Sequence, residues 1–117
     1  MMATIAFIGD VSSGLEQAFQ GRGHQVTRFS KLPPKKMLPV DLIIVQDPRK
    51  GWVESLLRRG PSFLTLALLA IKSGGVRARV GLIKKGVDRC FDPSEGPTVV
   101  VAHAESLVRM ISRSREL

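Results

Sequence analysis

The stretch PVDLIIVQDPRKGW, residues 39–52, decides the fold of this chain. Its aliphatic core LIIV is a continuous apolar run, which is typical of a parallel strand that helices cover on both faces. We therefore predict a buried strand at 41–45 that delivers the polar side chains after it, from Gln46 onward, to the edge of a sheet. Asp47 is expected to cap the helix that follows at 51–60, with Pro48 in its first turn.

Strand and helix patterns alternate on both sides of this stretch. Further strands of apolar character are predicted at 4–8, 25–29, 62–71 and 87–91. Helical spacing predicts helices at 12–23, 76–86 and 98–114. Ser13 and Glu16 match a capping box at the start of the first helix. The last helix carries an apolar stripe formed by Val101, Ala104, Val108 and Ile111.

This alternation predicts one α/β domain over residues 1–117. The expected architecture has three layers around a five-stranded parallel sheet, in the flavodoxin-like order 2-1-3-4-5. Three prolines at 30–39 leave room for one helical turn at most, so the second helix is expected to be short or missing. In such a sheet, ligands bind at the carboxyl ends of the strands.

Composition narrows the function classes. The 117 residues carry a net charge of +8, but the Lys and Arg residues are spread over several segments without interleaved aromatic residues. We therefore expect that this positive charge forms a solvated surface or binds an acidic protein partner, in preference to binding nucleic acid directly. No apolar run is long enough to span a bilayer, and no signal peptide is seen, so a cytoplasmic location is expected. Cys90, His24 and His103 do not suggest a metal site, and His24 is expected to be solvated in a turn.

The segments IAFIGD, GHQVTRF, PVDLIIVQD and KKGVDRCFDPSEGPTVVVAHAESLVRM, in this order, resemble the receiver domain of two-component response regulators. The resemblance covers nearly the whole chain. It implies a signalling module that holds magnesium with an acidic pair after the first strand and accepts a phosphoryl group on an aspartate after the third. It also implies a Ser or Thr after the fourth strand and a Lys before Pro after the fifth.

The sequence departs from that pattern at each position. The acidic pair is reduced to Asp10, the acceptor position holds Gln46, and Asp92 precedes Pro93 where the family has lysine. Asp47 comes one residue late, which turns its side chain to the other face of the strand. The register that we assign to the fourth strand places no hydroxyl at the switch position. These features predict a degenerate phosphorylation pocket, formed by Asp10, Gln46, Asp47 and Asp92, without catalysis, metal or cofactor.

A domain of this kind would act by binding partners. In receivers, the face formed by the last two helices and the last strand carries dimerisation and output contacts. The corresponding elements here contain Arg77, Arg79, Lys84, Val99, Val100 and His103. We expect this face to bind an output domain, an acidic protein or a second copy of the chain, independently of phosphorylation.

An alternative is a small Rossmann-like domain that binds NAD(P). IAFIGDVSSG contains Gly9 and Gly14 of a G-x-G-x-x-G fingerprint, and Arg28 stands near the place where a 2′-phosphate would be held. Val11 occupies the middle position of the fingerprint, where glycine would be needed for close approach to a pyrophosphate.

Overall fold

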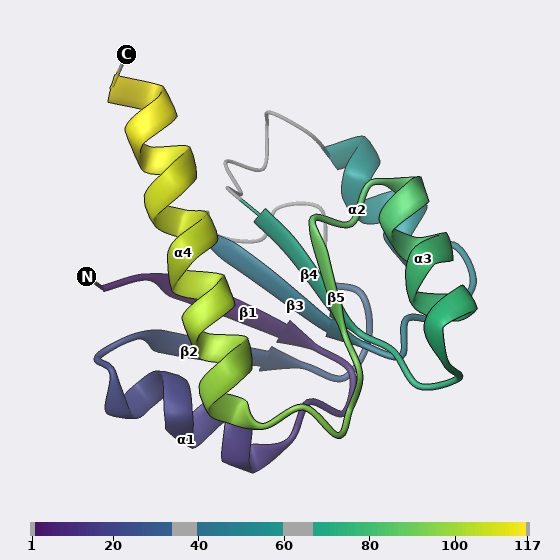
Figure 1. Ribbon diagram of the computed structural model, residues 1–117, viewed down its shortest axis with the longest axis horizontal. Helices are drawn as coiled ribbons and strands as arrows, with labels where there is room; N and C mark the ends of the chain where they lie inside the picture. Colours follow the sequence, from purple (N-terminus) through teal and green to yellow (C-terminus); the bar gives the residue numbers. More distant parts are fainter. Residues whose placement is uncertain (1, 34–39, 60–66, 117) are drawn as a thin grey trace.

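The computed structural model describes residues 2–33, 40–59 and 67–116. Within them the elements, in chain order, are β1 (Thr4–Ile8), α1 (Ser13–Gly21), β2 (Gln25–Phe29), β3 (Leu42–Gln46), α2 (Trp52–Arg59), β4 (Ala67–Ile71), α3 (Val76–Lys85), β5 (Arg89–Phe91) and α4 (Pro97–Glu116). The strands form one parallel sheet in the order β2-β1-β3-β4-β5, which confirms the predicted flavodoxin-like architecture (Figure 1).

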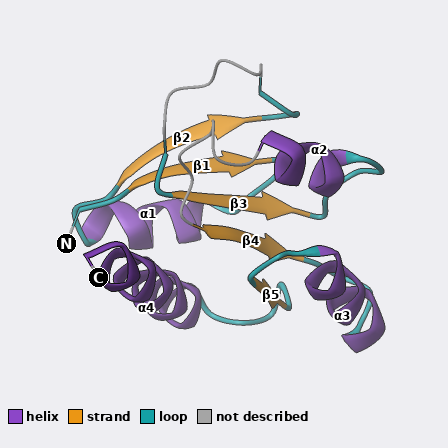
Figure 2. Cartoon of the chain, turned by 90° about the horizontal axis from the view of Figure 1, so that it is seen from above, coloured by secondary structure: helices purple, strands orange, loops and turns teal. Residues whose placement is uncertain are grey.

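The two faces of the sheet are buried by different helices. Side chains alternate along β1, so Ile5 and Phe7 join the core beneath α1 and α4, whereas Ala6 and Ile8 join the core beneath α2 and α3. Figure 2 shows α1 and α4 lying together on one side of the sheet. Burial on both faces explains why the central strands consist of uninterrupted apolar runs.

Several element boundaries differ from the prediction. Ser12, not Ser13, caps α1, since its hydroxyl accepts a hydrogen bond from Leu15 N at 3.1 Å. The third strand extends one residue further and includes Gln46, and the fifth strand begins at Arg89 instead of residue 87. Residues 34–39, where the second helix was in question, and 62–66 of the predicted fourth strand lie outside the described residues.

A glycine closes β1 for a steric reason. Gly9 has φ +90°, and a Cβ atom added there would lie 2.8 Å from the carbonyl oxygen of Gln46. Its N–H donates to the carbonyl oxygen of Phe29 at 2.8 Å. The close approach of the chain to the end of β3 therefore requires a residue without a side chain.

A buried polar cluster fixes α4 to the turn between α1 and β2. His24, expected in solvent, is only 4% exposed. Its Nδ1 accepts a hydrogen bond from Ala3 N at 2.9 Å, so the ring proton lies on Nε2, which donates to Glu105 Oε2 at 2.7 Å. Arg22 donates to the same carboxylate through Nε and Nη2, at 3.2 and 3.0 Å. The buried Glu105 is thus fully paired, as burial of a charge requires.

Candidate functional site

A hollow of about 210 Å³ lies at the carboxyl ends of the strands. Three of the four predicted pocket residues line it: Asp10 follows β1, Gln46 ends β3 and Asp92 follows β5. The fold therefore brings these three residues together from positions far apart in the sequence. Asp47, the fourth, is not among the lining residues. The remaining lining side chains are Ser12, Leu15, Ile71, Pro93, Glu95, Pro97 and Val100.

Gln46 occupies the last position of β3, opposite Ile71 of β4 in the parallel register. Its side chain is partly buried, and its Nε2 donates to Asp47 Oδ2 at 3.2 Å. A carboxamide is a hydrogen-bonding group and not a nucleophile at neutral pH. The side chain at the end of the central strand therefore cannot accept a phosphoryl group in the way that an aspartate does.

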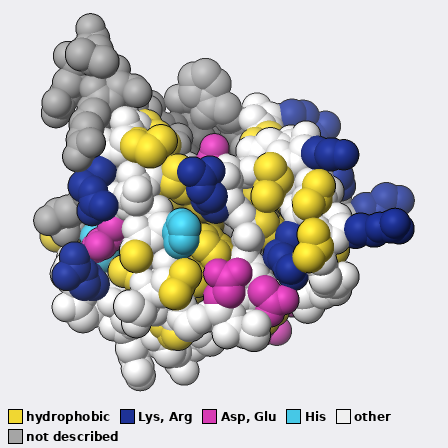
Figure 3. All heavy atoms as spheres, viewed as in Figure 1, with side chains coloured by type: hydrophobic (Ala, Val, Ile, Leu, Met, Phe, Trp, Pro, Cys, Tyr) yellow, Lys and Arg dark blue, Asp and Glu magenta, His cyan; other side chains and the backbone are white. Residues whose placement is uncertain are grey.

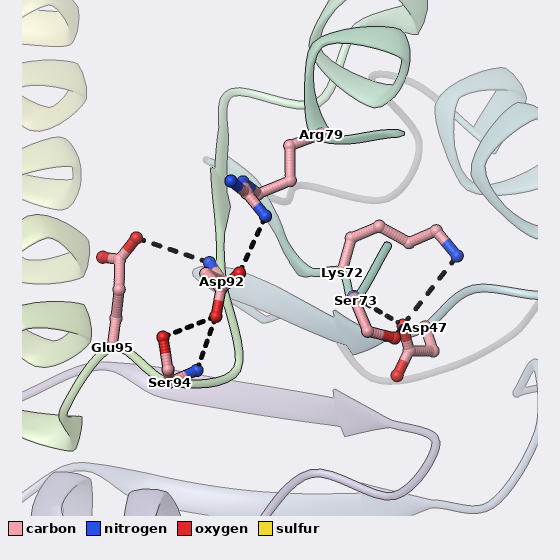
Figure 4. A network of polar contacts seen from close by, with 7 residues as sticks. All are labelled: Asp47, Lys72, Ser73, Arg79, Asp92, Ser94 and Glu95. Carbon is pink, nitrogen blue, oxygen red and sulfur yellow. Dashed lines mark hydrogen bonds and ion pairs between the residues drawn. The ribbon is translucent and has the colours of Figure 1, made fainter. Parts of the chain in front are cut away.

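The prediction that Asp47 caps a helix is wrong. Its backbone has φ +43°, and its Oδ1 accepts hydrogen bonds from Ser73 N at 2.9 Å and from Ser73 Oγ at 2.8 Å (Figure 4). Lys72 Nζ lies 3.9 Å from the same oxygen. Helix α2 begins only at Trp52, five residues later in the chain. Asp47 thus ties the loop after β3 to the loop after β4.

The surroundings of Asp47 favour its ionised form. Partial burial acts to raise the pKa of this carboxyl, but hydrogen bonds from the backbone and hydroxyl of Ser73, then from Gln46, lower it. The charge of Lys72 adds to that effect. The net result is a pKa below the ordinary value for Asp. Asp47 is therefore a constrained, negatively charged surface group.

Both carboxylate oxygens of Asp92 also accept hydrogen bonds from neighbouring residues. Its Oδ1 accepts hydrogen bonds from Ser94 N at 2.8 Å and Ser94 Oγ at 2.6 Å, and its Oδ2 accepts one from Arg79 Nη1 at 2.9 Å (Figure 4). The hydroxyl and backbone of Ser94 lower the pKa of Asp92, burial opposes this, and Arg79 adds to the lowering. Asp92 therefore organises the β5–α4 loop.

The hollow does not fit the magnesium ion that the receiver resemblance implies. Asp10 is exposed, while Asp92 is committed to Ser94 and Arg79. Within the described residues, no group of three His, Cys, Asp or Glu side chains is placed to hold a metal ion. Magnesium sites rely on carboxylate and other oxygen ligands held together. No step through a metal can therefore be assigned to this arrangement.

Only some residues of the predicted interaction face are exposed to solvent. Val99 is 44% exposed, and Arg77, Lys84 and His103 are also exposed. His103 packs its ring against Phe91, with centroids 5.5 Å apart. The placement of Val100 on this face is wrong, because Val100 is 3% exposed and belongs to the core beneath α1 and α4. The side chain of Arg79 is 19% exposed and paired with Asp92, so Arg79 contributes little free charge.

Sequence reasoning missed the polar residues after β4. The fourth strand ends at Ile71, so Lys72 and Ser73 are the first polar residues beyond it, beside Asp47. The predicted register put the switch position, which then lacks a hydroxyl, at residue 66 or at Ala70. Residue 66 lies outside the described residues, and Ala70 is buried in β4. The change from an aliphatic run to Lys-Ser-Gly-Gly is the signal that could have located it.

The geometry does not support the alternative of a dinucleotide-binding domain. The strand order differs from the 3-2-1-4-5-6 order of the classic Rossmann fold. Arg28 is paired with Glu16 and lies over the ring of Phe7, 5.5 Å from its centroid, so it is not free for a 2′-phosphate. Val11 is 3% exposed, and its side chain fills the core where a fingerprint glycine would stand.

No protein family model matches the sequence, and no curated protein matches it. Solved structures are nevertheless similar. NtrX from Brucella abortus, solved in complex with ADP, aligns with a TM-score of 0.82 at 15% identity, over 99% of this chain and 29% of NtrX. A CheY-like response regulator receiver domain protein from Methanospirillum hungatei JF-1 aligns with a TM-score of 0.79 at 9% identity, over 97% and 99% of the two chains.

Full-length FixJ from B. japonicum aligns with a TM-score of 0.77 at 16% identity, over 97% of this chain and 61% of FixJ. The chain thus has the fold of response-regulator receiver domains, and it spans about 29% of the length of NtrX and 61% of FixJ. In the described residues, no helix is both long enough and apolar enough to cross a membrane.

Proposed function

We propose that this chain is a non-enzymatic signalling domain of the receiver type, which acts through protein–protein contacts and does not depend on phosphorylation. The observation that carries the proposal is the position of Gln46. The resemblance to receivers implies an aspartate at the end of β3, and Gln46 holds that position and lines the hollow at the carboxyl edge of the sheet. An output domain or partner protein would then recognise a surface that no phosphoryl group switches.

The charge of the hollow supports the same proposal. Phosphoryl transfer requires positive groups that neutralise the oxygens of the transferred group. The described side chains lining the hollow include three carboxylates, of Asp10, Asp92 and Glu95, and no Lys or Arg. Arg79 lies nearby but is directed to Asp92. An anion entering this hollow would meet negative charge, which favours a domain that does not depend on phosphorylation.

Treatment with acetyl phosphate and magnesium chloride tests the proposal. Intact-mass spectrometry should show no adduct on the wild-type chain, on Gln46→Ala or on Asp47→Asn. A receiver domain with a complete site, treated in parallel, controls for the activity of the reagent. An adduct of one phosphoryl group on the wild type that disappears in Asp47→Asn would identify Asp47 as a displaced acceptor and overturn the proposal.

A further inference from the structure

Of the two histidines in the chain, the fold buries only His24, whose side chain is 1% exposed. The ring contacts three separate parts of the chain. Its Nδ1 accepts the N–H of Ala3 just before β1, its Nε2 donates to Glu105 of α4, and its edge packs against the ring of Phe19 in α1. The imidazole therefore joins the start of the first strand to both helices on that side of the sheet.

The contact at Nδ1 requires a neutral ring. A histidine nitrogen accepts a hydrogen bond only while it carries no proton, and both nitrogens are donors in the imidazolium. A second proton on His24 would therefore direct a ring N–H at the Ala3 N–H, across the 2.9 Å that separate the two nitrogen atoms. Ala3 is 3% exposed, so its N–H would be left buried without an acceptor, which is costly.

Two charged groups accompany the ring. Helix α4 supplies the Glu105 carboxylate, and Arg22, at the end of α1, donates to that carboxylate. Among the described residues, no other charged side chain forms a hydrogen bond or ion pair with His24 or Glu105. Hydrogen bonds from Arg22, opposed by burial and aided by His24, hold the pKa of Glu105 below its ordinary value. Glu105 and Arg22 therefore keep their charges between about pH 5 and pH 8, the range in which histidine side chains generally titrate.

The neighbouring contacts do not depend on the protonation of Nδ1. Thr4 N donates to Asp41 Oδ2 at 2.9 Å, and Gln25 N donates to the carbonyl oxygen of Ala3 at 2.9 Å. The contact with Glu105 also persists in the imidazolium, since Nε2 remains a donor and the hydrogen bond becomes charge-assisted on both sides. Protonation of His24 therefore breaks one contact, the one with the Ala3 N–H.

We propose that His24 is a pH-dependent switch that holds or releases the amino end of β1. While the ring is neutral, it accepts the Ala3 N–H and fixes the chain at the start of the strand. When Nδ1 takes a proton from solvent, the electroneutral group of His24, Glu105 and Arg22 becomes positively charged. The chain before Thr4 is then released, while α4 stays docked. This inference goes beyond the proposed function, because it adds an input that needs neither the hollow nor a phosphoryl group.

NMR of the nitrogen-15-labelled chain tests the proposal. The chemical shifts of the ring nitrogens report the protonation of His24, and a nitrogen–nitrogen coupling across the hydrogen bond reports its contact with Ala3. We expect this coupling at about pH 8 and its loss at about pH 5, in step with the imidazolium signals. The protection of the Ala3 N–H against solvent exchange should fall at least about tenfold, whereas that of Thr4 and Gln25 should stay within about twofold.

His24→Asn is the matched control. The amide oxygen of asparagine lies as many bonds from Cα as Nδ1 of histidine does, so it can accept the Ala3 N–H, but it takes up no proton in this range. Protection of the Ala3 N–H should then be the same at about pH 5 and pH 8. The α-amino group, which titrates near pH 8, is retained in this variant, so any effect of that group would remain visible.

His103→Gln removes the only other histidine of the chain. His103 is exposed, and a histidine ring lies open to solvent on the face shown in Figure 3. Since this ring accepts no hydrogen bond from the start of β1, the variant should lose the Ala3 contact on acidification as the wild type does. Circular dichroism of each variant checks that it is folded.

Three outcomes would overturn the proposal. The first is a coupling to Ala3 that persists after the ring of His24 has taken its second proton. The second is a ring that stays neutral down to about pH 5. The third is a loss of Ala3 protection in folded His24→Asn that equals the loss in the wild type. The first two are measured on the wild type alone, so they decide the matter even where the variant does not fold. None of these outcomes bears on phosphoryl transfer, which the mass measurement decides.

Discussion

Ser73 donates both its backbone N–H and its hydroxyl to the same oxygen of Asp47, at 2.9 and 2.8 Å. The two residues follow adjacent strands, β3 and β4, so the pair joins two loops at the carboxyl edge of the sheet. It also holds Asp47 at φ +43°, in a region that Asp tolerates better than most residues. This contact occupies the carboxylate that directly follows Gln46 in the chain.

Replacement of Ser73 by Ala should raise the pKa of Asp47. The hydroxyl hydrogen bond favours the ionised carboxylate, and its loss leaves only the backbone donor of residue 73. The cost in unfolding free energy should be about 1 kcal/mol or less, because both groups are exposed. Carboxyl-carbon NMR titration gives the pKa. An unchanged titration of Asp47 would mean that this hydroxyl contact is not formed in solution.

Val100→Asp should abolish or severely weaken folding. Val100 is 3% exposed within the core beneath α1 and α4, and an unpaired buried carboxylate should cost about 3 kcal/mol or more. The matched control is Val99→Asp, at a 44% exposed neighbour, which should change the stability by about 0.5 kcal/mol at most. Urea denaturation followed by circular dichroism compares them. Equal stability of the two variants would place Val100 outside the core.

Glu105 should make the fold sensitive to acid. The hydrogen bonds from Arg22 lower its pKa, burial opposes this, and His24 adds to the lowering. A folded pKa below the unfolded one stabilises the fold at pH values above the unfolded pKa, about 4.3 for Glu. That contribution should disappear as pH falls through the lower, folded pKa. Urea denaturation from pH 7 down to pH 3 measures it.

The isosteric variant Glu105→Gln provides the control for that measurement. It keeps the shape of the side chain but cannot titrate, so its stability should depend less on pH in the acidic range. The gap between wild type and variant should be largest above pH 5 and should close on acidification. A gap that stays constant over the whole range would show that the charge of Glu105 contributes nothing.

Gly9→Ala should destabilise the fold by more than about 1 kcal/mol, because a side chain at φ +90° is strained and its Cβ would meet the Gln46 carbonyl. Gly14→Ala is the matched control. Gly14 lies in α1 with nothing within 4 Å of an added Cβ, so alanine should be neutral or stabilising by up to about 1 kcal/mol. Thermal unfolding of both variants separates the effects, and similar midpoints would argue against the close approach.

The sheet could be predicted because its determinants are local. Runs such as Ile5 to Ile8 are apolar at every position. This pattern is typical of a strand whose two faces are both covered. The stripe of the last helix was also predicted from its spacing, and Val101, Ala104 and Val108 are buried. Alternation of such elements leaves few topologies for a parallel sheet.

The errors concern contacts between segments that are distant in sequence. Asp47 before Pro48 has the local appearance of a helix cap, but its partner, Ser73, lies 26 residues away. His24 follows a glycine in a turn, yet Glu105, 81 residues later, gives it a buried partner. Val100 was placed on the interaction face, although it precedes Ala104 by about one turn on the buried face of α4. Local propensity contains no information about such partners.

The imidazole of His24 offers a spectroscopic reporter of whether α4 is docked. Its Nδ1 receives the Ala3 N–H, so the ring holds a single tautomer with its proton on Nε2, directed at Glu105 and shielded from water. Such a proton should exchange slowly with solvent and give its own resonance in the proton NMR spectrum. Detachment of α4 would expose this proton and broaden its signal, so the docking of α4 can be followed without any label.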